Sequence, residues 1–142
     1  MIYYFDASAL VKAFSEEKGS KRVIEILNRE SPIYSSVILY PETLFALRRK
    51  REEGELLESE FQEQVREFQN RWEMFQIVEL HVFWFLQERI LQYPLKALDG
   101  IHLASALWVK EEIDECRFVT SDLTLLNYSK NAGLEVLNPE ED

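Results

Sequence analysis

The chain alternates between short, mostly apolar runs and longer segments whose apolar residues recur every three or four positions. The short runs are typical of strands buried on both faces. They predict strands at residues 2–5, 33–37, 76–80, 117–121 and 134–137. The longer segments have the period of amphipathic helices, and they predict helices at residues 7–14, 20–27, 41–54, 57–75, 82–91, 99–113 and 123–131.

The most regular helical segment starts at residue 57. Its apolar residues follow one another at intervals of four, four, three, four and three: Leu57, Phe61, Val65, Phe68, Trp72 and Phe75. This spacing predicts a single apolar stripe on one face of a helix. The preceding helix carries Pro41 in its first turn, where the missing N–H of proline costs nothing.

Strands and helices alternate along the chain, which predicts an α/β sandwich built on a mainly parallel sheet. A length of 142 residues fits one domain. The content of 46% hydrophobic and 13% aromatic residues is enough for one core and excludes a disordered chain. Because no internal repeat or linker divides the sequence, we expect a single domain over residues 1–142.

Several common chemistries lack the residues they need. The one cysteine, Cys116, allows neither an internal disulfide nor a thiolate zinc cage. The four glycines are too scattered for a phosphate-binding loop, and no Gly-x-Ser-x-Gly motif is present. His81 and His102 lack the spacing of a zinc site. Asp6 interrupts the apolar N-terminus and no run approaches the ~18 residues of a membrane span, so we expect a cytoplasmic protein without membrane association.

The net charge of −10 results from 26 acidic and 16 basic residues. Affinity for nucleic acid comes mostly from clustered lysines and arginines, so the overall field does not favour binding of RNA or DNA. Any RNA substrate would have to be selected by shape and a few local contacts, which predicts a narrow set. Most acids belong to the polar faces or ends of predicted helices, where solvation accounts for them.

Four other acids stand where a strand ends or where the next helix begins: Asp6, Glu42, Asp99 and Asp122. In a parallel sheet the C-terminal ends of the strands share one edge, and ligands bind in the crevice at that edge. We therefore expect these four side chains to meet there. The alternative is that each one caps a helix, because carboxylates are favoured at helix N-termini.

The apolar neighbours of Asp6, Asp99 and Asp122 favour a shared site over simple caps. Carboxylates in apolar surroundings lose hydration, and clustered carboxylates repel one another. Mg²⁺ or Mn²⁺ removes both penalties, prefers carboxylate oxygens and keeps water ligands. Such a site serves hydrolytic phosphoryl transfer, because the metal activates water and neutralises charge on the phosphate.

Four motifs in order resemble those of the PIN-domain family of metal-dependent ribonucleases, and within it the VapC-type toxins of toxin–antitoxin pairs. Residues 3–12 (YYFDASALVK) are similar to its opening strand and Asp-x-Ser/Thr turn. Glu42 with the helix that follows resembles the second acid, and residues 98–106 (LDGIHLASA) resemble the third motif. Residues 120–122 (TSD) and the tail up to Pro139 resemble the last.

The resemblance implies a five-stranded parallel sheet between two layers of helices. It implies that Asp6, Glu42, Asp99 and Asp122 bind Mg²⁺ or Mn²⁺ and catalyse hydrolysis of an RNA phosphodiester bond. Ser8 and Thr120 would orient these carboxylates through hydrogen bonds. The family also implies a homodimer that a cognate antitoxin silences by covering the acidic groove.

Basic residues 48–51 form the strongest positive run in the chain. One interpretation is a solvated helix end, where cations complement the helix dipole. The other is that Arg48 or Arg49 holds an RNA phosphate or an antitoxin carboxylate, and Lys12 is a weaker candidate for the same role. His102 lies three residues after Asp99; a buried, hydrogen-bonded histidine is favoured over a general base.

Three tryptophans lie in apolar helical segments, and we expect Trp72, Trp84 and Trp108 in the core or in a dimer interface. The run Phe83–Phe85 exceeds what one helix face can bury and indicates a partner surface. A catalytically silent PIN-like module that binds RNA or protein remains the alternative function. A receiver-type phospho-acceptor domain fits less well, because Ala7 follows Asp6 where such domains carry adjacent acids.

Overall fold

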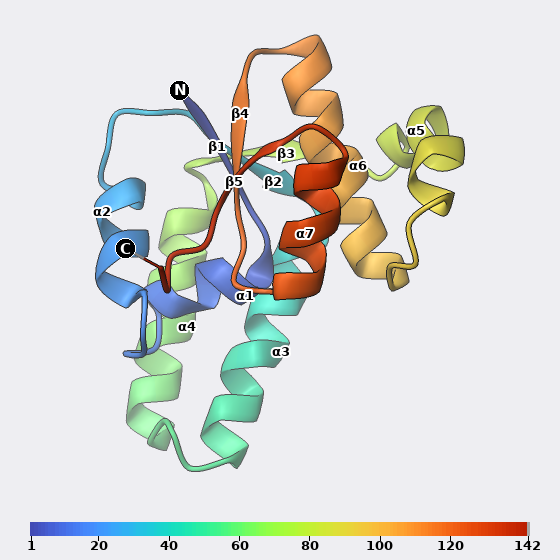
Figure 1. Cartoon of the computed structure of the whole chain (residues 1–142). Coiled ribbons are helices and arrows are strands. Elements are labelled where there is room, and N and C mark those ends of the chain that lie inside the picture. Colours follow the sequence, from blue (N-terminus) through green and yellow to red (C-terminus); the bar gives the residue numbers. More distant parts are fainter. Residues whose placement is uncertain (142) are drawn as a thin grey trace.

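The computed structural model describes residues 1–141 (Figure 1). The strands are β1 Ile2–Phe5, β2 Ile33–Ser36, β3 Phe75–Val78, β4 Cys116–Val119 and β5 Glu135–Leu137. The helices are α1 Ala7–Leu10, α2 Ser20–Leu27, α3 Leu39–Glu52, α4 Glu58–Trp72, α5 Val82–Leu91, α6 Ala97–Glu112 and α7 Leu123–Asn131, and a 3₁₀ turn, η1 Val11–Ala13, follows α1. Within the described residues, no helix is both long and apolar enough to cross a membrane.

The five strands form one sheet in the order β3-β2-β1-β4-β5, and every pair is parallel. After β1 the chain builds the sheet outward through β2 and β3, and then returns to the other side of β1 for β4. The strand order therefore reverses between β1 and β4, and a crevice opens beyond the C-terminal ends of these two strands. The predicted five-stranded parallel sheet is confirmed.

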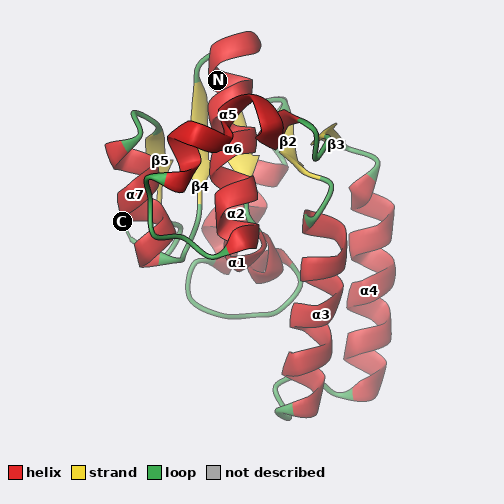
Figure 2. Cartoon of the chain, turned by 90° about the vertical axis from the view of Figure 1, so that its right-hand side faces the viewer, coloured by secondary structure: helices red, strands yellow, loops and turns green. Residues whose placement is uncertain are grey.

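Helices cover both faces of the sheet. Successive side chains of β1 point to opposite faces, and each set packs against a different group of helices. Tyr3 and Phe5 pack into a core with α1, α2, α3 and α4. Ile2 and Tyr4 point to the opposite face and pack into a second core with α5, α6 and α7. This is the predicted three-layer α/β/α sandwich. The long helices α3 and α4 lie side by side and extend beyond the sheet (Figures 1 and 2).

The helical stripe that begins at residue 57 is shorter than its periodicity predicts. Leu57 precedes α4 and is 68% exposed, and its backbone N–H donates to Glu60 Oε1 at 2.9 Å, which caps the helix. Phe75 belongs to β3 and not to the helix. Within α4 only Phe68 is fully buried, because this helix covers one edge of the sheet and packs mainly against α3.

Candidate functional site

The four acids predicted to meet line one cleft at the C-terminal edge of the sheet. Asp6 follows β1 and Asp122 follows β4, the two strands at the reversal of strand order. Glu42 and Asp99 lie in the first turns of α3 and α6. The cleft has a volume of about 690 Å³, within the range of small-molecule and nucleotide sites.

Asp6 is buried and its two carboxylate oxygens are fully engaged. Oδ1 accepts the backbone N–H of Ala9 at 3.1 Å, and Oδ2 accepts the Thr120 hydroxyl at 2.7 Å. The Ser8 hydroxyl lies 2.8 and 2.9 Å from Oδ1 and Oδ2. Burial raises the pKa of Asp6, and these hydrogen bonds oppose the rise. The hydrogen-bonding roles predicted for Ser8 and Thr120 are therefore present in the structure.

Ser8 and Thr120 also join the two loops that follow β1 and β4. The backbone N–H of Ser121 donates to Ser8 Oγ at 3.0 Å, and that of Asp122 donates to Thr120 Oγ1 at 3.1 Å. Each hydroxyl thus donates its proton to Asp6 and accepts a backbone N–H from the loop that follows β4. This places the carboxylates of Asp6 and Asp122 at fixed positions on the same wall of the cleft.

Glu42 is held by a buried chain of hydrogen bonds that reaches into the core. Its Oε1 lies 2.6 Å from His102 Nε2, and His102 Nδ1 lies 2.8 Å from the Tyr4 hydroxyl. A carboxylate only accepts, so Nε2 carries a proton. Burial raises the pKa of Tyr4, which keeps its proton and can donate it to Nδ1. His102 is 1% exposed, which confirms the buried, hydrogen-bonded interpretation.

Asp122 and Asp99 have different surroundings. Asp122 caps α7 by accepting the N–H of Leu125 at 3.0 Å, just as Asp6 caps α1. The two aspartates are therefore helix caps and cleft residues at once. Asp99 accepts no hydrogen bond from residues 1–141. Burial first, and then the charges of Asp122 and Glu42, raise the pKa of the Asp99 carboxyl.

The donor set of the cleft fits a hard divalent cation in chemical type. Its ionisable groups include four carboxylates from separate segments, and one of them, Asp99, has both oxygens free of hydrogen bonds within residues 1–141. Oxygen ligands of this kind suit Mg²⁺ and Mn²⁺. In the described conformation, no three His, Cys, Asp or Glu residues of 1–141 stand close enough together to hold a metal ion. A cation would have to draw these carboxylates closer together than they lie in this conformation.

The basic candidates divide between the cleft and its surroundings. Arg49 is exposed, lines the cleft and pairs with no carboxylate of residues 1–141. Arg48 pairs with Glu52 at 3.5 Å outside the cleft. Lys12 does not reach the cleft, since its ammonium is buried 2.8 Å from Glu17. The predicted contact from Lys12 is therefore not supported, because its side chain is buried beside the C-terminal tail and pairs with Glu17 and Glu140.

Two further cleft residues do not follow from the sequence motifs. Lys50 lines the cleft and pairs with Glu17, at 2.5 Å, and with Glu55, at 3.1 Å. Phe45 lines the cleft one turn after Glu42. The sequence signal for Phe45 is its spacing of three from Glu42, which places both on one helical face.

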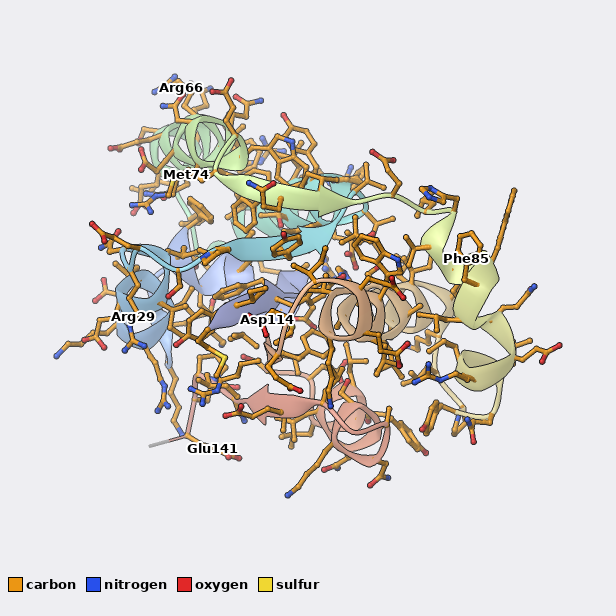
Figure 3. All side chains as sticks on the ribbon, turned by 90° about the horizontal axis from the view of Figure 1, so that it is seen from above. Arg29, Arg66, Met74, Phe85, Asp114 and Glu141 are labelled. Carbon is orange, nitrogen blue, oxygen red and sulfur yellow. The ribbon has the colours of Figure 1, made fainter. Side chains whose placement is uncertain are left out.

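Of the three tryptophans expected in the core or in an interface, two pack against the cores and one is exposed. Trp72 packs with Tyr40 and Phe75 in one core, and Trp108 packs against the other. Trp84 is 73% exposed on α5. Its neighbour Phe85, labelled on α5 in Figure 3, is 76% exposed.

Known proteins are similar to this chain in sequence and in fold. Ribonucleases VapC45 and VapC49 of Mycobacterium tuberculosis, strains CDC 1551 / Oshkosh and ATCC 25618 / H37Rv, are each 34% identical over 110 residues, which is 76% of this chain and 76% of theirs. The crystal structure of PAE2754 from Pyrobaculum aerophilum, at 19% identity, superposes with a TM-score of 0.67 and covers 96% of this chain and 83% of that one.

A second structural neighbour is VapBC2 from Rickettsia felis, solved bound to a DNA fragment from its promoter. It is 16% identical, has a TM-score of 0.63, and covers 97% of this chain and 98% of that one. At these identities the two structures support the fold alone. The family profile described as the PIN domain matches residues 3–131 of this chain. Together with its cleft of four acids at the edge of a parallel sheet, this match shows that the chain belongs to the PIN-domain family.

Proposed function

We propose that this chain is an endoribonuclease that hydrolyses RNA phosphodiester bonds with the help of Mg²⁺ or Mn²⁺. The observation that carries the proposal is the convergence of Asp6, Glu42, Asp99 and Asp122. These acids come from four separate segments and line one cleft at the reversal of strand order. Helix capping accounts for Asp6 and Asp122 but not for Asp99, which caps nothing and has a raised pKa.

The four carboxylates would hold the metal, and hydrogen bonds from neighbouring side chains orient two of them, Asp6 and Glu42. When bound, the metal supplies an activated water and neutralises charge on the phosphate. Ser8 and Thr120 hold Asp6 in one orientation, and His102 does the same for Glu42. Arg49 would contact an RNA phosphate; this role is supported by its position at the cleft and by the lack of a carboxylate partner in residues 1–141.

The relatives extend the proposal to a partner. Two of them are named VapC ribonucleases, and a structural neighbour is a VapBC complex. We therefore propose that the chain is the toxin of a toxin–antitoxin pair and that its antitoxin covers the acidic cleft, with Arg49 available to an antitoxin carboxylate. The exposed apolar residues of α5, Trp84 and Phe85, are the proposed surface for a homodimer.

Cleavage of total cellular RNA, read by sequencing of the new ends, tests the nuclease. The protein is freed of any co-purified partner and assayed with Mn²⁺, with Mg²⁺ and with chelator. We expect metal-dependent cuts at few sites and a loss of at least about 100-fold in Asp6→Asn. Glu63→Gln is the matched control, because Glu63 is an exposed acid on α4 outside the cleft.

Equal activity in wild type and Asp6→Asn would overturn the assignment of the site. Cleavage that persists in chelator would overturn the metal dependence. If wild type cuts no RNA and titration calorimetry detects no Mn²⁺ binding, the silent binding module becomes the better account.

A further inference from the structure

One face of α3 presents three kinds of side chain to the cleft. Glu42, Phe45 and Arg49 follow at i, i+3 and i+7, and all three line the cavity. At this spacing they form a stripe along the helix, and the segment from Glu42 to Arg49 spans about 10 Å of its axis. The stripe therefore runs from an acid, through an aromatic ring, to a guanidinium.

Phe45 is unusual in this stripe because it is apolar and 54% exposed. It is the only aromatic residue among the residues 1–141 that line the cleft. The Arg48 guanidinium lies over the ring, 4.7 Å from its centroid. Arg48 also pairs with Glu52 at 3.5 Å, so one side of the ring is covered by a cation.

The order of these groups matches the order of groups along an RNA strand. A scissile phosphate belongs at the carboxylate end, and the next phosphate of the strand needs a cation. Between two phosphates lies a nucleoside whose base is free to stack on an aromatic ring in single-stranded RNA. Arg49 is the cation in the cleft that pairs with no carboxylate of residues 1–141.

We propose that Phe45 is a base-stacking residue for the nucleotide next to the cleaved bond, with Arg49 contacting the phosphate beyond it. This inference rests on the proposed ribonuclease function and adds a subsite for a nucleobase to it. Stacking on Phe45 is sequence-tolerant, because every base has a π-face. The subsite therefore fixes where the strand lies and requires an unpaired base at this position.

An apolar segment of a protein partner would use Phe45 differently. Phe45 also lines a second, apolar pocket between α3 and α4, together with Leu44, Phe61 and Val65. A protein segment held there would need bulk and hydrophobicity from residue 45 but no aromatic face. The two occupants are thus distinguished by substitutions that keep the bulk and remove the ring.

Steady-state cleavage of a defined single-stranded RNA, taken from the mapped cut sites, tests the subsite. We expect Phe45→Ala and Phe45→Leu to raise KM roughly 5- to 100-fold with kcat nearly unchanged, and Phe45→Trp to restore KM. Met74→Ala is the control, since Met74 is 53% exposed near β3 and outside the cleft (Figure 3). Unchanged KM in Phe45→Ala, or full rescue by Phe45→Leu, would overturn the proposal.

A photocrosslink separates this inference from the ribonuclease proposal. The same RNA carrying 5-iodouridine beside the cut position is irradiated with the Asp6→Asn variant, in which we expect cleavage to be too slow to consume the RNA during the experiment. We expect the crosslink in the tryptic peptide of residues 30–48, and its loss in the double variant that adds Phe45→Leu. If the wild type cleaves no RNA, a single-stranded RNA with 5-iodouridine at every uridine replaces the mapped substrate, and a crosslink to the same peptide would keep the subsite and reject the nuclease. A crosslink confined to other peptides would reject the subsite. If Phe45→Ala captures a protein partner more weakly but cleaves RNA with a normal KM, the ring belongs to the contact with that partner.

Discussion

Asp6 and Asp99 line the same cleft, but their neighbours stabilise the charge of the Asp6 carboxylate and destabilise that of Asp99. Asp6 is buried, but two hydroxyls and a backbone N–H stabilise its charge. Asp99 has no hydrogen bond from residues 1–141 and faces the charges of Asp122 and Glu42. The free energy of folding therefore includes a penalty for ionising Asp99, which a bound cation would remove.

This penalty gives the metal-free protein a specific pH dependence. The folded-state pKa of Asp99 is raised, so the folded protein binds more protons than the unfolded chain between the ordinary and the raised pKa. Its contribution to stability therefore falls as pH rises through that window. We expect Asp99→Asn to raise the melting temperature of the metal-free protein at pH 7 by on the order of 2 °C, with a smaller gain as pH falls toward about 4.

Differential scanning calorimetry across this pH range, in chelator, measures the effect. Glu63→Gln, an exposed acid of α4, should show no such trend. Added Mn²⁺ should stabilise wild type more than Asp99→Asn. If Asp99→Asn is less stable than wild type at pH 7 in chelator, the ionisation penalty assigned to Asp99 is contradicted.

At the scale of elements, the C-terminal tail is docked onto the start of α2 through a glycine. Gly19 precedes α2 with φ +91°, and a Cβ placed on it would lie 2.9 Å from the Pro139 carbonyl oxygen. The backbone of Pro139 therefore occupies the space that any side chain at position 19 would need. Arg22 holds the same tail by donating to the Glu141 carbonyl at 2.8 Å.

Gly54 provides a matched comparison, because it has φ +80° but no atom within 4 Å of the place where a Cβ would lie. Gly54→Ala carries only the backbone strain of a left-handed residue, about 1 kcal/mol. Gly19→Ala adds the collision with Pro139, and we expect a total loss of about 3 kcal/mol. Urea unfolding of both variants measures the difference. Equal losses would mean that the tail moves aside freely and does not contribute to the fold.

The same scale shows what the sequence can and cannot predict. The period of apolar residues and the alternation of strand and helix segments predict the order of the elements. The geometry of a parallel sheet then predicts that the four acids line one edge. The partners of His102 are not predictable in this way, since Tyr4 and Glu42 are 98 and 60 residues away. The prediction for Lys12 fails for a related reason: its partner Glu17 is near in sequence, but its burial depends on how α2 and the tail pack.

At the scale of the whole molecule, the net charge of −10 leaves few cations free to bind phosphate at the cleft. Eight of the 16 lysines and arginines pair with carboxylates of the described chain: Lys12, Arg48, Lys50, Arg51, Arg71, Arg89, Lys110 and Arg117. Of the remaining eight, Arg49 alone lines the cleft in residues 1–141. RNA binding should therefore involve few phosphate contacts, and its selectivity should come from shape.

Few contacts mean a weak dependence of RNA affinity on salt. Each neutralised phosphate of a single strand contributes about −0.7 to the slope of log K against log[salt]. With Arg49 and the partly engaged Lys50 at the cleft, we expect a slope between about −0.7 and −1.4. Fluorescence anisotropy with Asp6→Asn, at fixed Mn²⁺ and varied KCl, measures it, and Arg49→Gln should flatten the slope by about 0.7. A slope steeper than about −3 would require a basic surface outside the cleft, such as the pocket at the start of α2 that Lys18, Lys21 and Arg22 line. RNA selection would then no longer depend on the cleft alone.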